Sequence, residues 1–303
     1  QGTMQLGALS RAPIFWALAA SAAIASVPWH GAPWLLPGWR GKRPLPRVAR
    51  AAGRARDEGD KDWRDVRAYL VMRERLEGGL ADPSATDGQL LEDVAKGWAY
   101  ATPMIESGSV LLAQPGGQFA LTQPYFHKSM ILVARHLSDF DIGLIVNRPT
   151  SFSTAQIGLP GPPWPVWYGG DCNGLSMLPS RQRVGRPKKD PEVVCLHVND
   201  ELGGSEILPG VYMMSLQSAR SLATLGLASQ RDFLTVVGYC GWGEAQLQSE
   251  LELGSYWTAA AFDRQTLRRE LRRACNPPRA ERAEAVSLDG GVGLWRGLYD
   301  RIG

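Results

Sequence analysis

Residues 143–149, GLIVNRP, combine a short apolar run with a polar ending, which predicts a strand that ends at Asn147-Arg148-Pro149. Pro149 restricts Arg148 to extended conformations and cannot donate to a central ladder, so we expect Arg148 to point out of the sheet edge. Its planar fork suits a carboxylate or a phosphate, and Asn147 offers both a donor and an acceptor. A structural alternative stays open, in which Arg148 pairs with an internal acid and Asn147 caps a turn.

A second group of candidate residues lies in the stretch 238–250, GYCGWGEAQLQSE. A strand predicted at 233–239 leads into a turn with three glycines, Gly238, Gly241 and Gly243. Glycine permits positive φ and a close chain reversal, and a helix is expected to begin near Glu244. The sequence therefore predicts a tight strand-to-helix turn.

The start of that helix is a candidate anion site, because its first backbone N–H groups lack partners within the helix. Gln246 and Glu250 lie one helical turn apart on one face. Tyr239 and Trp242 either wall a small pocket there or are core aromatics that lock the turn. The sequence leaves both interpretations open.

The rest of the body alternates short strands and helices. Apolar runs bounded by Gly, Pro and Asp predict strands at 109–113, 130–134, 143–146, 166–168, 193–198, 211–214 and 233–239. Helices are predicted at 60–76, from Thr86 as N-cap to residue 98, and at 217–227, 244–253 and 263–273, the last capped by Asp263. No regular strand-helix-strand rhythm is present, so a mixed α+β domain is expected.

Five motifs in this order resemble the YqgE/AlgH family. They are GSVLLAQP at 108–115, FHKSMILVARH at 126–136, DIGLIVNRP at 141–149, VWYGG at 166–170 and FLTVVGYCGWGEAQLQSELELGSYW at 233–257. The resemblance covers about residues 106–262, and its several motifs make it specific. DKDWRDVRAYLV at 60–71 and LWRGLYDRIG at 294–303 further resemble the plastid-targeted members.

This resemblance implies an α+β fold with a mixed, strongly bent, partly barrel-like β-sheet flanked by helices. It implies no agreed catalytic activity and no cofactor, although bacterial members have been treated as transcriptional regulators. One departure concerns the site: relatives commonly have Gly-Gly-Pro where this chain has Gly169, Gly170 and Asp171. The missing proline loosens a turn, and the added carboxylate changes the local charge.

Residues 1–56 are expected to be a targeting leader. An apolar run at 12–27, too short for a comfortable membrane span, contains the small-residue pattern Ala23-Ile24-Ala25 of a signal peptide. The following basic, acid-free segment 37–56 is typical of an organelle transit peptide. The two signals predict the plastid stroma, including a complex plastid reached through the secretory pathway. A plain secretory signal with a basic linker, or a basic tail, is the alternative.

The remaining chain divides into three parts by the same patterns. We expect a helical N-terminal extension at 57–105, a YqgE/AlgH-like domain at 106–285 and a C-terminal tail at 286–303. Two basic clusters fall within the body, at 181–189 and 264–282.

The charge distribution argues against nucleic acid as the partner. Eight of the 33 Lys and Arg residues lie in the leader, whereas all 30 Asp and Glu residues follow it. The body is therefore net negative, and its basic clusters are interpreted as a solvated loop and a solvated helix face.

Cysteine and histidine spacing predicts neither a disulfide framework nor a metal site. Cys172, Cys195, Cys240 and Cys275 form no Cys-x-x-Cys pair, and the histidines are scattered. Cys240 in the glycine-rich turn suggests a nucleophile, with His136 or His197 as its base. A packing role for Cys240 is the favoured interpretation.

These patterns together predict a binding or regulatory protein without established catalytic activity, whose partner is an unknown protein or a small anionic ligand. No cofactor, no metal, no nucleic acid and no membrane span in the mature chain are expected. The alternatives are a small-molecule enzyme with a cleft near Arg148 and the Gly238–Gly243 turn, or a transcriptional regulator. The candidate site comprises Asn147, Arg148, Pro149, Gly169, Gly170, Gly238, Tyr239, Gly241, Trp242, Gln246 and Glu250.

Overall fold

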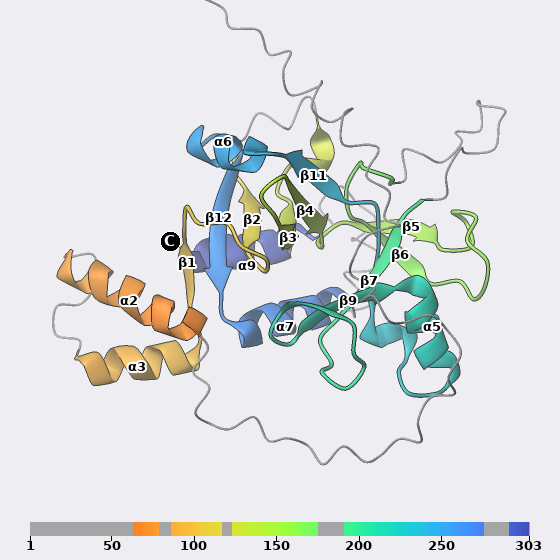
Figure 1. Ribbon diagram of the computed structural model, residues 1–303, viewed down its shortest axis with the longest axis horizontal. Helices are drawn as coiled ribbons and strands as arrows, with labels where there is room; N and C mark the ends of the chain where they lie inside the picture. The colour runs from red at the N-terminus through yellow and green to blue at the C-terminus, as the bar shows by residue number, and fades with distance from the viewer. Residues whose placement is uncertain (1–62, 79–85, 117–122, 175–190, 276–290, 303) are drawn as a thin grey trace, which may run out of the picture.

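The chain folds into two six-stranded β-sheets with helices on their faces (Figure 1). The computed structural model describes residues 63–78, 86–116, 123–174, 191–275 and 291–302. The predicted mixed α+β class is confirmed, whereas the described sheets are open at their edges and do not close into a barrel. The predicted leader and the basic cluster at 181–189 lie outside these residues.

The first sheet is antiparallel throughout, in the order β1-β12-β2-β3-β4-β11. Its strands are β1 (Ala99–Ala101), β2 (Val110–Ala113), β3 (Met130–His136), β4 (Phe140–Ile145), β11 (Cys240–Gly243) and β12 (Trp257–Phe262). β2 is buried along its whole length, because Val110 and Leu112 face one apolar cluster while Leu111 and Ala113 face another. Both faces of this sheet are therefore covered.

The second sheet has the order β5-β6-β10-β7-β9-β8, with β6 and β10 parallel and the other pairs antiparallel. Its strands are β5 (Pro149–Ser153), β6 (Pro165–Tyr168), β7 (Val193–His197), β8 (Ser205–Leu208), β9 (Val211–Ser215) and β10 (Leu234–Val237). The chain passes between the sheets twice where the sequence analysis placed its motifs. β4 leads through Asn147-Arg148 into β5, and β10 leads through Gly238-Tyr239 into β11.

Helices cover the sheets. They are α2 (Trp63–Glu77), α3 (Asp87–Lys96), α5 (Leu216–Thr224), α6 (Gln246–Glu252), α7 (Arg264–Cys275) and α9 (Val292–Ile302), with the 3-10 turns η2 (Pro124–Phe126) and η4 (Gln230–Asp232). One large core joins inward side chains of both sheets to α7 and α9, while α6 and α5 cover the other faces of the first and second sheets. Predicted caps are confirmed at both sites: Thr86 Oγ1 accepts from Gln89 N (3.3 Å), and Asp263 Oδ1 accepts from Thr266 N (2.8 Å).

The predicted turn from Gly238 to Gly243 is wrong beyond its first residue. Only Gly238 of the three glycines has a positive φ, at 74°. Gly241 and Gly243 lie in β11, which pairs with β4, and the helix begins at Gln246, two residues after Glu244. Successive side chains of a strand point to opposite faces, so Cys240 and Trp242 of β11 are buried while Gly241 and Gly243 are half-buried.

The predictions also missed β1, β5, β8, β12 and α9. β12 has the sequence WTAAAF, and alanine is depleted in strands, so propensity alone does not favour it. The segment expected to be a tail contains α9, whose Trp295, Leu298 and Ile302 enter the large core. The indole N–H of Trp295 donates to Ala113 O at 2.9 Å.

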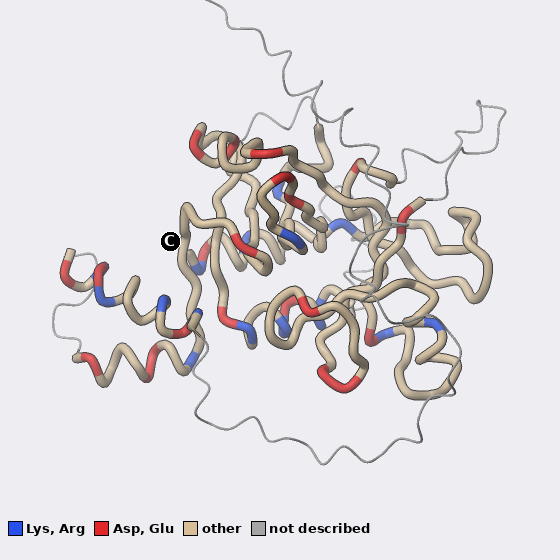
Figure 2. The backbone as a smooth tube through the Cα atoms, in the orientation of Figure 1, with Lys and Arg blue, Asp and Glu red and all other residues tan. Residues whose placement is uncertain are grey.

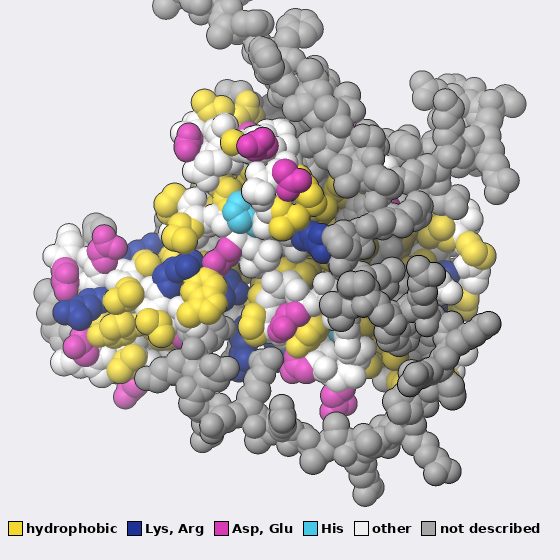
Figure 3. Space-filling model, in the orientation of Figure 1, with side chains coloured by type: hydrophobic (Ala, Val, Ile, Leu, Met, Phe, Trp, Pro, Cys, Tyr) yellow, Lys and Arg dark blue, Asp and Glu magenta, His cyan; other side chains and the backbone are white. Residues whose placement is uncertain are grey.

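The predicted N-terminal extension packs on the edge of the first sheet through β1 and α2, where Ala68, Trp98, Tyr100 and Ala261 form a small apolar cluster. Its outer surface keeps apolar side chains: Trp63 is 52% exposed and Leu70 is 55% exposed. Figure 3 shows hydrophobic side chains on the protruding α2–α3 hairpin, interspersed with charged ones.

Candidate functional site

Asn147 is a buried link between three segments, which is closer to the structural alternative for this residue than to a ligand-binding role. The residue is 2% exposed. Its Oδ1 accepts from Met130 N at 2.8 Å, and its Nδ2 donates to Lys128 O and Gly291 O, both at 3.0 Å. This one amide binds three main-chain groups. It therefore fastens the link between β4 and β5 to β3 and to the start of α9.

Arg148 is half-buried and holds the same turn from the other side. Its guanidinium donates to His127 O and, at 3.4 Å, to Asn147 O. Burial lowers the pKa of Arg148 to about 10, which leaves it charged at neutral pH.

Two further basic residues lie at this turn, because Arg148 binds the main-chain carbonyl of His127 and Asn147 binds that of Lys128. Lys128 has a left-handed backbone with φ 54°, and its Nζ lies 6.0 Å from the centre of the Trp295 ring. The pKa of His127 is lowered by burial first and then by the charges of Lys128 and Arg148. We call His127, Lys128 and Arg148 the cationic corner. The sequence had signalled only Arg148.

The predicted glycines pack against one another where the two sheets meet. Gly169 N donates to Val237 O at 2.8 Å, and Gly169 O accepts from Ile145 N at 2.9 Å. A Cβ on Gly170 would lie 2.2 Å from the Tyr239 carbonyl carbon, and one on Gly238 would lie 2.4 Å from Gly170 O. This glycine junction therefore needs residues without side chains.

The cationic corner and the glycine junction are neighbours. Arg148 O accepts from Tyr168 N at 2.8 Å, one residue before Gly169, and Pro149 begins the strand that pairs with Trp167. Asp171, which stands where the family resemblance implies a proline, is exposed and accepts from the Tyr168 hydroxyl at 3.5 Å. The structure thus brings together seven of the predicted residues, Asn147, Arg148, Pro149, Gly169, Gly170, Gly238 and Tyr239.

Trp242, Gln246 and Glu250 form a separate cluster under α6. Trp242 pairs in register with Asp141, and Gly241 with Ile142, toward the other end of β4 from Asn147. Glu250 Oε2 accepts from the indole N–H groups of Trp242 and Trp257, both at 2.9 Å.

The other oxygen of that carboxylate completes the cluster. Glu250 Oε1 accepts from Gln246 Nε2 at 2.9 Å, and Gln246 Oε1 accepts from Gly243 N at 3.1 Å. These groups bind one another, so the cluster fastens α6 to β11 and β12.

Cys240 lacks the environment of an activated nucleophile. Its thiol donates to Gly169 O at 3.5 Å, and burial raises its pKa well above the ordinary value. Within the described residues no hydrogen bond joins Cys240 to either proposed base. His136 Nδ1 instead lies 2.6 Å from Asp141 Oδ1, and His197 is 2% exposed between aromatic rings.

The basic cluster on α7 is partly engaged inside the molecule. Arg268 donates to Val198 O at 2.7 Å, and Arg269 and Arg273 form ion pairs with the buried Glu270. Leu267 and Leu271 point inward on the opposite side of this helix, in agreement with the predicted solvated face for its arginines. Figure 2 shows the basic segments of α7 beside acidic ones.

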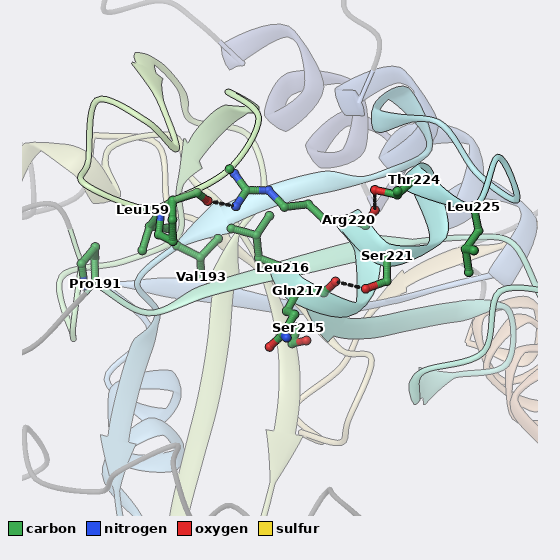
Figure 4. A pocket seen from close by; sticks show the side chains of 12 residues that line it. Leu159, Pro191, Val193, Ser215, Leu216, Gln217, Arg220, Ser221, Thr224 and Leu225 are labelled. Atoms are coloured by element: carbon green, nitrogen blue, oxygen red, sulfur yellow. Dashed lines mark hydrogen bonds between the residues drawn. The ribbon is translucent and has the colours of Figure 1, made fainter. Parts of the chain in front are cut away.

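A groove beside α5 was not anticipated from the sequence. It encloses about 1050 Å³ and is open to solvent, with α5 as one wall and the turn at 159–161 as the other (Figure 4). Its lining consists of Leu159, Pro160, Gly161, Pro191, Val193, Ser215, Leu216, Gln217, Arg220, Ser221, Thr224 and Leu225. We call this the α5 groove. The one indication of it in the sequence is Arg220, the single charged residue of an otherwise apolar and hydroxyl-rich helix.

The described residues offer neither a cluster of metal ligands nor a membrane-spanning helix. No three His, Cys, Asp or Glu side chains in this part of the chain are grouped so that they could hold a metal ion. No helix in it has both the length and the apolar character needed to cross a bilayer.

Comparisons with known proteins show a match to one family model and similarity to bacterial proteins. The family model described as AlgH-like matches residues 110–274. The chain is 25% identical over 173 residues to the UPF0301 protein CT0663 of Chlorobaculum tepidum, covering 56% of this chain and 83% of that protein. It is 28% identical over 204 residues to the UPF0301 protein RHOS4_26140 of Cereibacter sphaeroides, covering 65% and 91%.

Among solved structures, the solution structure of the AlgH protein from Pseudomonas aeruginosa is similar. It shares 20% identity, covers 62% of this chain and 89% of that chain, and superposes with a TM-score of 0.40.

Proposed function

Because the chain belongs to the AlgH-like family, which has no characterised activity, we propose that it is a binding or regulatory protein whose cationic corner takes an anionic group. The ligand class is a carboxylate or phosphate, carried by a small molecule or by a partner protein. The plastid stroma is the proposed location, supported by the acid-free leader.

One observation carries the proposal: Asn147 binds the main-chain carbonyl of Lys128, Arg148 binds that of His127, and the charges of Lys128 and Arg148 both act on the His127 imidazole. The turn that presents Lys128 has a left-handed φ, which a non-glycine residue adopts only when surrounding contacts stabilise it. Clustered positive charges repel one another, and an anion between them relieves that repulsion.

Binding is favoured over catalysis by the state of the candidate nucleophile. A buried thiol with a raised pKa is protonated at neutral pH and reacts slowly. The cationic corner needs no proton transfer to act, because guanidinium and ammonium groups bind anions in their ordinary charged state.

Titration of inorganic phosphate and citrate into the full chain tests the proposal, with the His127 imidazole resonance followed by NMR. A bound anion would offset the charges of Lys128 and Arg148, so we expect the pKa of His127 to rise on saturation. Lys128→Gln should weaken binding about tenfold, in line with a charge-assisted contact of roughly 1.5 kcal/mol.

Arg272→Gln is the matched control, because Arg272 is an exposed cation on α7. Unchanged His127 titration with either anion, or equal losses in Lys128→Gln and Arg272→Gln, would reject the cationic corner as the site. Location is tested separately: residues 1–56 fused to a fluorescent protein should direct it to plastids, and a purely secreted fusion would contradict that part.

A further inference from the structure

The α5 groove is distinct from the cationic corner, and we propose that it docks an extended peptide segment of a partner protein, one that carries an acidic residue between apolar ones. The lining combines one cation with apolar walls, and the groove is open to solvent. Charge, wall chemistry and shape each support this occupant.

Arg220 supplies the charge. It is the sole charged residue among the twelve described residues that line the groove. Its guanidinium donates to Thr154 Oγ1 at 2.8 Å, to Pro162 O at 2.6 Å and to Pro160 O, all of them neutral oxygens. None of the Asp or Glu side chains in the described ranges forms an ion pair with it. A carboxylate in the groove would therefore meet a positive charge that no acid of the described residues pairs with.

The walls are more apolar than their residue types suggest. Ser221 Oγ donates to Gln217 O at 3.0 Å, and Thr224 Oγ1 donates to Arg220 O at 2.9 Å. Both hydroxyl protons are thus bound within α5, as the dashed lines of Figure 4 show for these residues. Leu225, which is 62% exposed, extends the apolar surface at the end of the helix. Apolar side chains of an occupant would contact these walls.

The shape favours a chain over an enclosed small molecule. The residues of α5 that line the groove run from Leu216 to Thr224, about 12 Å along a helix. An extended peptide spans that length with about four residues, so an acidic side chain near Arg220 has apolar neighbours on both sides. Small ligands are usually held in pockets that bury most of their surface, which this open groove does not provide.

Replacing Arg220 would not distinguish peptide binding from a purely structural role of this residue. Arg220 also fixes the turn at 160–162 and lies 5.9 Å from the centre of the Trp164 ring, so its replacement could loosen the wall itself. Gln217 avoids this problem because it is an exposed groove residue. Opposite charges placed there change the electrostatics of the groove without removing the guanidinium of Arg220 or any of its acceptors.

The test is panning of a random 12-residue peptide display library on the full chain. Enriched peptides are then synthesised with a fluorescent label, each beside an analogue in which Asp or Glu is replaced by Asn or Gln. We expect the enriched sequences to hold an acidic residue flanked by Leu, Ile, Val or Phe. Fluorescence anisotropy should show at least tenfold weaker binding of the neutral analogues.

Charge variants then locate the binding. Gln217→Glu should weaken it about threefold to fivefold and Gln217→Lys should strengthen it by a similar factor, as for exposed charge pairs. Leu225→Ser should also weaken it, whereas Arg272→Gln and Lys128→Gln should not. Neutral or basic consensus peptides, absence of any enriched peptide, or equal effects of the two Gln217 variants would overturn the proposal. These outcomes do not depend on whether the cationic corner binds phosphate, so the two proposals can be rejected separately.

Discussion

The indole N–H of Trp242 donates to Oε2 of Glu250 at 2.9 Å, and this bond ties β11 to the helix that follows it. The same carboxylate accepts from Trp257 on β12 and from Gln246 within α6. One side chain therefore joins two strands and a short helix of only seven residues. Such a short helix depends on these tertiary contacts, because isolated helices of this length are unstable in water.

We predict that Glu250→Ala lowers the free energy of unfolding by about 2–4 kcal/mol, because three donors lose their acceptor. Chemical denaturation followed by tryptophan fluorescence measures this change. Glu252→Ala is the control, since Glu252 is exposed on the same helix and should cost no more than about 0.5 kcal/mol. Equal losses in the two variants would contradict the anchoring role of Glu250.

The glycine junction yields a matched comparison between two left-handed glycines. Gly238 has φ 74° and Gly226 has φ 69°, so an added side chain strains the two backbones alike. A Cβ on Gly238 would meet Gly170 O at 2.4 Å, whereas one on Gly226 meets nothing within 4 Å. Gly226→Ala should cost about 1–2 kcal/mol, and Gly238→Ala clearly more, about 3 kcal/mol or above. Thermal unfolding of both variants checks the difference, and similar melting temperatures would be the contrary result.

Sequence patterns predicted the strands here better than the side-chain partners. The apolar runs that became β3, β4 and β10 were recognisable because burial on both faces favours continuous Val, Ile and Leu. The burial of Asn147 was not recognisable from the sequence, because its partners Met130 and Gly291 lie 17 and 144 residues away in the chain. Local patterns carry no information on such distant pairs.

The dependence on distant partners also explains why the sequence predicted neither the α5 groove nor the strand β12. Arg220 meets its oxygen partners across 58 to 66 residues of sequence, so nothing near it predicted a wall on the far side. The strand β12 is alanine-rich and becomes a strand because β1 and β2 pair with its two edges. In both cases tertiary structure overrides local preference.

The buried amide of Asn147 gives a third prediction. Asn147→Leu has a similar size but leaves the N–H of Met130 and the carbonyls of Lys128 and Gly291 without this partner. We expect a loss of about 3 kcal/mol in urea unfolding, because each buried unpaired group costs about 1 kcal/mol or more. Gln248→Leu, on the exposed face of α6, is the control and should be nearly neutral. A neutral Asn147→Leu would show that the amide is dispensable.

Alkylation of the native protein tests the state of Cys240. Iodoacetamide reacts with thiolates, and burial raises the pKa of this thiol, so labelling at neutral pH should be far slower than for free cysteine. Peptide mass spectrometry should find Cys240 labelled only after unfolding in urea. Rapid labelling in the folded protein would restore the nucleophile hypothesis.

The buried His197 makes stability depend on pH. Burial lowers its pKa below the ordinary value near 6.5, and this effect exceeds the opposing contributions of Gly203, Asn199, Asp200 and Asp232. Between the folded and the unfolded pKa the unfolded chain therefore binds more protons than the folded one. Stability is fully present above about pH 6.5 and falls as the pH drops toward the folded pKa, by up to roughly 1.4 kcal/mol per pH unit.

His197→Phe isolates this contribution, because the ring can still stack on Tyr212 while the titrating ring nitrogens are removed. We expect the variant to be at least as stable as the parent at pH 8 and to lose less stability between pH 7 and pH 5. Urea midpoints across that range measure the difference. His127→Gln serves as the comparison, because His127 is only half-buried and its lowered pKa comes partly from the neighbouring cations. If the parent and His197→Phe show the same slope, the acid sensitivity arises elsewhere, and the buried imidazole does not control it.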